Sequence, residues 1–122
     1  MHSIIVDIET NAIEDWRELT DLKEIHCIVI RGRSSVETYN HQKGNIEEAL
    51  NEIYLADEVI GHNAMAFDIP AIKKLYPDFK MNGCLRDTML LSRLVWPDIR
   101  DDDFKRGEPY PKNLIGSHSL KA

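Results

Sequence analysis

Residues 5–10 read Ile-Val-Asp-Ile-Glu-Thr, and this stretch decides the fold. Apolar and polar side chains alternate, which predicts a β-strand with one buried face. Asp7 and Glu9 are two residues apart, so both side chains point to the same face of that strand. Two carboxylates this close repel each other unless a cation neutralises them, and divalent cations prefer oxygen ligands. We expect a metal site here, and the alternative is a solvated face of an edge strand.

The composition sets the class of protein. A chain of 122 residues is enough for one domain with a real core. The 21 Asp and Glu residues outnumber the 15 Lys and Arg residues, so the composition indicates no general phosphate-binding surface. Any attraction of nucleic acid must come from a metal ion, a small patch or another domain.

The cellular setting follows from the cysteines and the hydropathy pattern. Cys27 and Cys84 lack metal-ligand spacing and indicate buried or free thiols in a reducing compartment. No stretch approaches a transmembrane length, and no charged segment precedes a long apolar run at the N-terminus. We therefore expect an unprocessed cytoplasmic protein with no membrane partner.

Hydrophobic periodicity predicts three N-terminal strands, adjacent and antiparallel at least in part, and then alternating helices and strands. This order indicates a mixed α/β sheet covered by helices. Asn45 is the expected N-cap of the first helix, and Asp87 that of the third. The polar segment 98–113 is expected to be a long loop in which Asp101, Asp102 and Asp103 are solvated. The predicted strands cover 5–10, 25–30, 35–39 and 58–61, and the predicted helices cover 45–54, 70–75 and 87–95.

A third acid follows the strand predicted at 58–61. Asp68 ends the segment His62-Asn63-Ala-Met-Ala-Phe-Asp, directly before a predicted helix. The helix dipole and nearby N–H groups can keep such a carboxylate ionised. Asp68 as a simple N-cap is the alternative interpretation. Together with Asp7 and Glu9, it supplies three acids at one edge of the predicted sheet, which is typical of a divalent metal site.

Four segments, in order, carry a family resemblance. Asp7-Ile-Glu9-Thr10 is similar to the first motif of the DEDD 3′–5′ exonucleases, and Asn63-x-x-x-Phe67-Asp68 resembles their second. More specifically, the chain looks like the N-terminal proofreading domain of the family A DNA polymerases of podophages of the T-odd type. The match also includes the strand with His26-Cys27, the segment Asp87-Thr-Met-Leu-Leu-Ser-Arg-Leu94, and Gly116-Ser-His-Ser-Leu120.

The resemblance implies an RNase H-like fold, that is, a mixed α/β sheet flanked by helices. It also implies two-metal hydrolysis of the 3′-terminal phosphodiester of single-stranded DNA, with Mg²⁺ as the cofactor and Mn²⁺ as a substitute. If the matching residues have the roles known for the family, Asp7 is expected to bridge both ions, and Glu9 is expected to bind the ion that holds the attacking water. Asp68 binds the other ion, directly or through water.

The resemblance suggests weaker roles for other residues. Thr10 is expected against the terminal nucleotide, and Asn63 either binds substrate or fixes the turn before the third acid. Phe67 is a candidate substrate contact, although its place on the apolar side of the helix favours the core. Three histidines lack metal-ligand spacing and are interpreted as structural or surface residues, namely His26, His62 and His118.

The chain departs from the family at its third motif. The DEDD enzymes need a fourth acid, preceded on the same helix by a Tyr or His that acts on the water. No such helix is found, and residues 117–122 resemble the capped first turn of a helix that does not continue. We therefore expect 1–122 to be a single, partial exonuclease domain whose C-terminal helices are missing. It would be an isolated fragment, half of a split polymerase, or a natural short homologue.

The sequence leaves three classes of function open. The first is the proofreading exonuclease domain, which acts on a single-stranded DNA 3′ end and needs a polymerase domain or second polypeptide with the third motif. Activity of the isolated chain is expected to be absent or strongly reduced. The second is an exonuclease-like interaction protein without chemistry. The third, another RNase H-like Mg²⁺ enzyme such as an endonuclease, is disfavoured by the Asn-x3-Phe-Asp motif.

Overall fold

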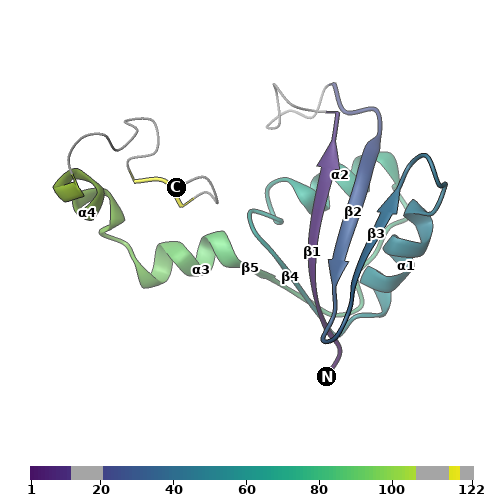
Figure 1. The fold of residues 1–122 in the computed structure, drawn as a ribbon, viewed down its shortest axis with the longest axis horizontal. Helices are drawn as coiled ribbons and strands as arrows, with labels where there is room; N and C mark the ends of the chain where they lie inside the picture. Colours follow the sequence, from purple (N-terminus) through teal and green to yellow (C-terminus); the bar gives the residue numbers. More distant parts are fainter. Residues whose placement is uncertain (12–20, 107–115, 119–122) are drawn as a thin grey trace.

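The described part of the chain forms a five-stranded mixed sheet with helices packed against it. The computed structural model describes residues 1–11, 21–106 and 116–118. The strands are β1 (Ser3–Thr10), β2 (Ile25–Arg31), β3 (Val36–Asn40), β4 (Glu58–Gly61) and β5 (Cys84–Asp87). Their order is β3-β2-β1-β4-β5 (Figure 1). β1, β2 and β3 pair antiparallel, whereas β1, β4 and β5 run parallel, so the predicted mixed α/β sheet is confirmed.

One face of this sheet is buried and the other is open. In β1, Ile4, Val6 and Ile8 are buried and alternate with partly or fully exposed residues. Helices α1 (Ile46–Leu55) and α2 (Asp68–Leu75) pack against the buried face, and their apolar residues join the same core (Figure 1). Each large aliphatic side chain buried there contributes about 1.5–3 kcal/mol, so this core dominates the stability.

Helix α1 matches the predicted helix over 45–54, but its start is held differently. Asn45 occupies the N-cap position and makes no side-chain cap hydrogen bond. Its Oδ1 instead accepts the N–H of Asn40 at 2.8 Å. The side chain therefore fastens the helix start to the end of β3, a role that local spacing does not reveal.

Strand β5 is an element that the sequence pattern did not predict. Its residues are exposed or half-buried except Asp87, so it lacks the alternating apolar signal of a strand. Gly83 allows the chain to approach its neighbour, because an added Cβ would lie 2.1 Å from the carbonyl oxygen of Asp57. Close backbone packing at this glycine lets β5 pair with β4.

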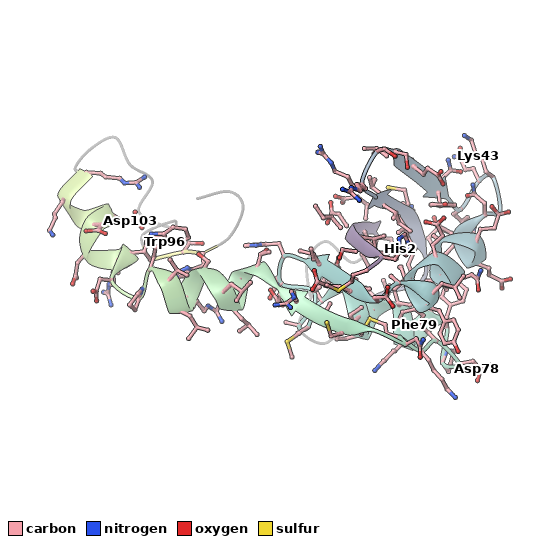
Figure 2. The ribbon with its side chains drawn as sticks, turned by 90° about the horizontal axis from the view of Figure 1, so that it is seen from below. His2, Lys43, Asp78, Phe79, Trp96 and Asp103 are labelled. Atoms are coloured by element: carbon pink, nitrogen blue, oxygen red, sulfur yellow. The ribbon has the colours of Figure 1, made fainter. Side chains whose placement is uncertain are left out.

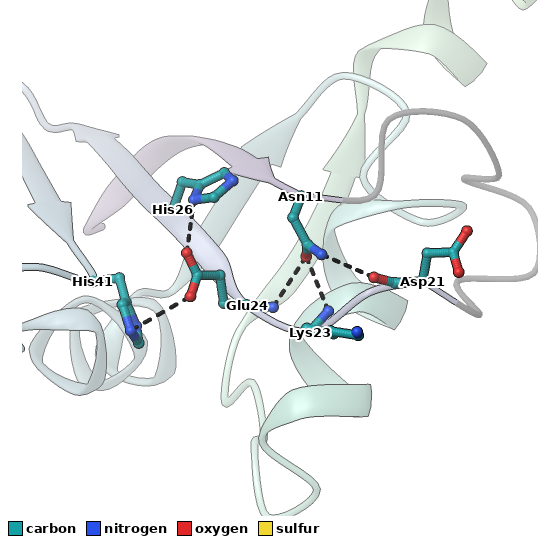
Figure 3. A network of polar contacts seen from close by, with 6 residues as sticks. All are labelled: Asn11, Asp21, Lys23, Glu24, His26 and His41. Carbon is teal, nitrogen blue, oxygen red and sulfur yellow. Dashed lines mark hydrogen bonds and ion pairs between the residues drawn. The ribbon is translucent and has the colours of Figure 1, made fainter.

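Asn11 fixes the end of β1 to the start of β2. Its Oδ1 accepts the N–H groups of Lys23 at 2.9 Å and Glu24 at 3.1 Å, and its Nδ2 donates to the Asp21 carbonyl at 2.9 Å (Figure 3). The Glu24 carboxylate in turn contacts His26 at 3.0 Å, in β2. This network holds the strand end that follows Glu9 and Thr10 in a defined position.

Two helices leave the sheet body, which we define as β1–β5 with α1 and α2. Helix α3 (Thr88–Val95) starts directly after β5 and is followed by α4 (Ile99–Arg106), and we call these two helices the arm (Figure 1). The helix predicted over 87–95 is confirmed, yet none of the α3 residues is buried. Figure 2 shows Trp96 and Asp103 on the arm, well separated from His2 and Phe79 of the sheet body.

Helix α4 corrects the predicted loop over 98–113. Its first turn holds Asp101 and Asp102, and its last turn holds Lys105 and Arg106. Both ends therefore carry the sign of charge that the helix dipole favours, which compensates for the lack of an apolar stripe. The remainder of the predicted loop, 107–113, lies outside the described residues. No helix in the described ranges is long and apolar enough to cross a membrane.

The three consecutive aspartates of α4 do not share one environment. Asp101 and Asp102 are exposed as predicted, but Asp103 is only 2% exposed, so its predicted solvation is wrong. Its Oδ2 accepts the N–H of Gly116 at 2.9 Å, and its Oδ1 lies 3.6 Å from Nε of Arg106. Asp103 therefore ties the segment 116–118 to the arm. The helical turn expected at the C-terminus falls mostly on 119–122, outside the described residues.

Candidate functional site

Asp7 and Glu9 lie on the open face of the sheet, as their spacing predicts. Both are exposed, and they pair in register with Val29 and Cys27 of β2. β4 pairs with β1 only as far as Ile5, so the two acids lie beyond the end of β4. β1 is the middle strand of the sheet, so the edge-strand part of the alternative is wrong, but its solvated face is confirmed because both acids are exposed. They lie toward the carboxyl ends of the parallel strands, where open α/β sheets commonly bind ligands.

Asp68 lies at the start of α2, next to β1. It is 5% exposed and is the first residue of the helix, whereas Phe67 holds the N-cap position. No side-chain cap hydrogen bond is made there, so the N-cap alternative for Asp68 is wrong. The backbone N–H of Ile8 donates to the Asp68 carboxylate, at the side of β1 that β4 no longer covers.

The electrostatics show that Asp68 and Asp7 are neighbours. Burial, and then the Asp7 carboxylate, raise the pKa of Asp68 to about 7, while the Ile8 N–H opposes this shift. Asp87 adds a smaller repulsion. A buried acid beside a second acid is protonated near neutral pH unless a cation neutralises the pair. The two side chains thus supply oxygen ligands and a charge that a divalent cation would balance.

The third predicted metal ligand is Glu9. Glu9 shares the open face with Asp7 two residues further along β1. In the part of the chain that the structure describes, no three His, Cys, Asp or Glu side chains are grouped so that they could hold a metal ion. The charges that raise the pKa of Asp68 are those of Asp7 and Asp87, and Glu9 is not among them.

The three predicted substrate contacts are in different surroundings. Thr10 is buried at the end of β1, next to a shift in register against β2. Asn63 has a positive φ of 59°, and its carbonyl accepts the N–H of Phe67 at 3.0 Å, so it fixes the turn before Asp68. Phe67 is partly buried and packs against the core, as its place in the helical pattern favours.

Asp87 has a larger role than the cap that the sequence predicts. Its carboxylate accepts the N–H of Met89, and the N-cap prediction is confirmed. It also accepts the N–H groups of Asn63 at 2.9 Å and Met65 at 3.0 Å. Asp87 therefore joins the turn before Asp68 to the start of α3. The partners lie more than 20 residues away, so no local pattern could have revealed them.

Two histidines connect the arm to the end of β4. His62 Nδ1 lies 2.8 Å from Thr88 Oγ1, and its Nε2 lies 2.8 Å from the His118 carbonyl. His118 Nδ1 lies 2.7 Å from Ser92 Oγ. These hydrogen bonds hold segment 116–118 between α3 and the sheet, and the structural interpretation of both histidines is confirmed. Their mutual contact was not foreseen.

The comparisons with known proteins identify no relative. No model of a known protein family matches the chain. A search of curated protein sequences finds no significant match either. The function must therefore be argued from the site itself.

Proposed function

We propose that this chain is a 3′–5′ exonuclease domain of the proofreading type, with an RNase H-like fold and single-stranded DNA as its substrate. The observation that supports the proposal best is the burial of Asp68 at the start of α2, where its carboxylate accepts the N–H of Ile8 and its pKa responds to the charge of Asp7. The motif resemblance predicts this pair of acids, although they are 61 positions apart. The mixed sheet and the strand order are compatible with that fold.

The site residues have definable tasks in this proposal. Asp7 and Asp68 bind Mg²⁺ or Mn²⁺ through carboxylate oxygens, and Glu9 contributes from the same face of β1. The bound ions would activate a water and stabilise the attacking and leaving oxygens of the in-line displacement. Asn63 and Asp87 keep the turn before Asp68 rigid, so the acid is held beside Asp7 before any ligand arrives.

A second polypeptide or a polymerase domain completes the site in this proposal. The acids described supply fewer ligands than the two ions need, and the family's third motif would contribute the fourth acid and a Tyr or His. The exposed end of α3 is a suitable contact, because Leu94 is 77% and Val95 is 62% exposed. Soluble monomers rarely leave such a surface uncovered. The same surface supports the alternative of a non-catalytic interaction protein.

A metal titration tests the proposal. Mg²⁺ or Mn²⁺ should raise the Tm of the wild-type chain at pH 7, because a cation that binds only the folded state stabilises it. At one hundred times Kd the gain is about 2.7 kcal/mol. Asp7→Asn and Asp68→Asn should abolish most of the shift, whereas exposed Asp78→Asn should keep it. Equal shifts in all four proteins would refute the metal site.

Product analysis separates the candidate functions. A 5′-labelled single strand incubated with the chain and Mn²⁺ should be shortened slowly from its 3′ end, with release of mononucleotides, and Asp7→Asn should stop this. Internal cuts would instead favour an endonuclease. Metal binding without any cleavage at high protein concentration would favour the interaction protein. Robust cleavage by the isolated chain would contradict the need for a second polypeptide.

A further inference from the structure

A hollow of about 250 Å³ lies beside the candidate site. Its walls come from the turn between β4 and α2 and from the first two turns of α3. The volume is slightly below the usual range for small-molecule pockets, so it suits one planar ring system. Its lining includes Asn63, Met65, Met89, Leu90 and Arg93.

The hollow is close to the paired acids. Asp87 lies at its base and accepts the N–H groups of Asn63 and Met65, which belong to the turn that leads to Asp68. β1, β4 and β5 run parallel, so their carboxyl ends share one edge of the sheet. Ile60 of β4 is in register with Ile5 of β1 on one side and with Arg86 of β5 on the other. Neighbouring strands are about 4.8 Å apart, which puts Arg86, the residue before Asp87, roughly 10 Å from Ile5, two residues before Asp7. This is close enough for one extended strand to contact both places.

The lining combines an apolar platform with a cation. Met65 is 56% exposed and Leu90 is 44% exposed, and methionine packs well against flat rings. Arg93 lies three residues after Leu90 and four after Met89, so all three share one side of α3. Among the described residues Arg93 forms no ion pair, in contrast to Arg86, which pairs with Glu58. Sites for single-stranded nucleic acid combine positive charge with side chains against which the bases pack. Here Arg93 supplies the charge, and the packing surface is apolar without an aromatic ring.

The charge of the whole chain makes this position important. With a net charge of −6, the protein repels nucleic acid in general. A metal ion, a local patch or another domain must therefore supply the attraction, and this hollow is a candidate for the local patch. Arg93 is an exposed cation in the lining of a hollow next to the acid site.

We propose that this hollow holds the base of the nucleotide next to the 3′-terminal one, with the Arg93 guanidinium on an adjoining phosphate. The inference rests on the proposed function, because it takes the terminal nucleotide to lie at Asp7 and Asp68. Met65 and Leu90 pack against the base without reading its identity. Arg93 acts as a positioning residue that sets the path of the strand.

The test is the binding of a fluorescein-labelled oligothymidylate in the presence of EDTA. Binding is measured by fluorescence anisotropy at salt concentrations from about 25 to about 200 mM. EDTA removes divalent ions, so the affinity is independent of the metal site. Arg93→Ala should weaken binding about tenfold and reduce the slope of log K against log salt by about 0.7, the value for one phosphate contact on a single strand. Arg93→Lys should restore most of the slope.

Two further variants make the test specific. Leu90→Ala should weaken binding several-fold without changing the salt slope, because it removes packing and no charge. Arg33→Ala is the matched control, since Arg33 is also exposed but lies in the turn between β2 and β3. Circular dichroism checks that each variant is folded.

The outcomes are distinguishable from those of the metal titration. Unchanged affinity in Arg93→Ala, an equal loss in Arg33→Ala, or no binding by the wild type would overturn the inference, whatever the metal does. If Arg93 matters and the metal titration fails, the hollow remains a strand-binding site and the exonuclease proposal is lost. If the metal binds and Arg93 has no effect, only the hollow is refuted.

Discussion

The sheet body and the arm differ in how they are held. The body encloses side chains such as Ile28 and Ile53, which have no measurable exposure. The arm has no buried residue in α3, and Leu94 is 77% exposed. Hydrogen bonds of Asp87 and His62 connect the start of α3 to the body. The comparison shows that apolar packing stabilises the body, whereas hydrogen bonds position the arm and the apolar side chains of α3 stay exposed.

The largest difference is expected from truncation of one apolar side chain in each region. Ile53→Ala should lower the free energy of unfolding by about 2–5 kcal/mol, because it leaves a cavity in the shared core. Leu94→Ala should change it by less than about 0.5 kcal/mol, since the side chain is already in water. Urea denaturation followed by circular dichroism measures both. Similar losses would show that the arm is packed as tightly as the body.

The acid site should make the stability of the body depend on pH. In the unfolded chain the pKa of Asp68 is near its ordinary value of about 3.9, and in the folded state it is about 7. Between these values the folded state binds more protons, so the free energy of unfolding falls as the pH rises from about 4 to about 7, and this loss levels off at higher pH. The full loss from this group is on the order of 4 kcal/mol.

Asp68→Asn removes the titrating group. The free energy of unfolding of Asp68→Asn minus that of wild type should therefore be larger at pH 8 than at pH 5. Urea denaturation without metal measures both values. Exposed Asp78→Asn should follow the wild-type pH profile. Parallel profiles for Asp68→Asn and wild type would contradict the predicted environment of this acid.

The junction between body and arm depends on Asp87. Asp87→Ala leaves three N–H donors without their acceptor, in Asn63, Met65 and Met89. The loss should be about 2–3 kcal/mol, which combines a lost cap with hydrogen bonds to a charged group. Hydrogen exchange should accelerate in α3 more than in β1. Equal acceleration in both elements would contradict a separate junction.

The smallest of these effects concerns the edge strand. Gly83→Ala puts a Cβ against the backbone of Asp57 and should cost about 1–3 kcal/mol through displacement of β5. Gly32→Ala is the control, because its nearest neighbours lie at 3.8 Å and beyond. Thermal unfolding compares the two. A loss no larger than that of the control would show that β5 is not held by close backbone contact.

Much of the sheet body could be predicted from the sequence because its signals are local. The alternation in residues 5–10 predicts β1, and the apolar spacing of 45–54 predicts α1. β5 could not be predicted in this way, because its side chains carry no apolar alternation and its place depends on Gly83. Helix α4 was missed for a related reason, since it is specified by charges at its ends.

In the candidate site, too, some features follow from local sequence patterns and others depend on tertiary contacts. The sequence by itself determines that Asp7 and Glu9 share one face, because side chains alternate along a strand. Only the tertiary structure decides that the Asp68 carboxylate is buried on the N–H of Ile8, and that Asp87 holds the turn between β4 and α2. These contacts join residues that are far apart in the chain. They depend on where β4 ends and how the strands are ordered, which no local pattern encodes.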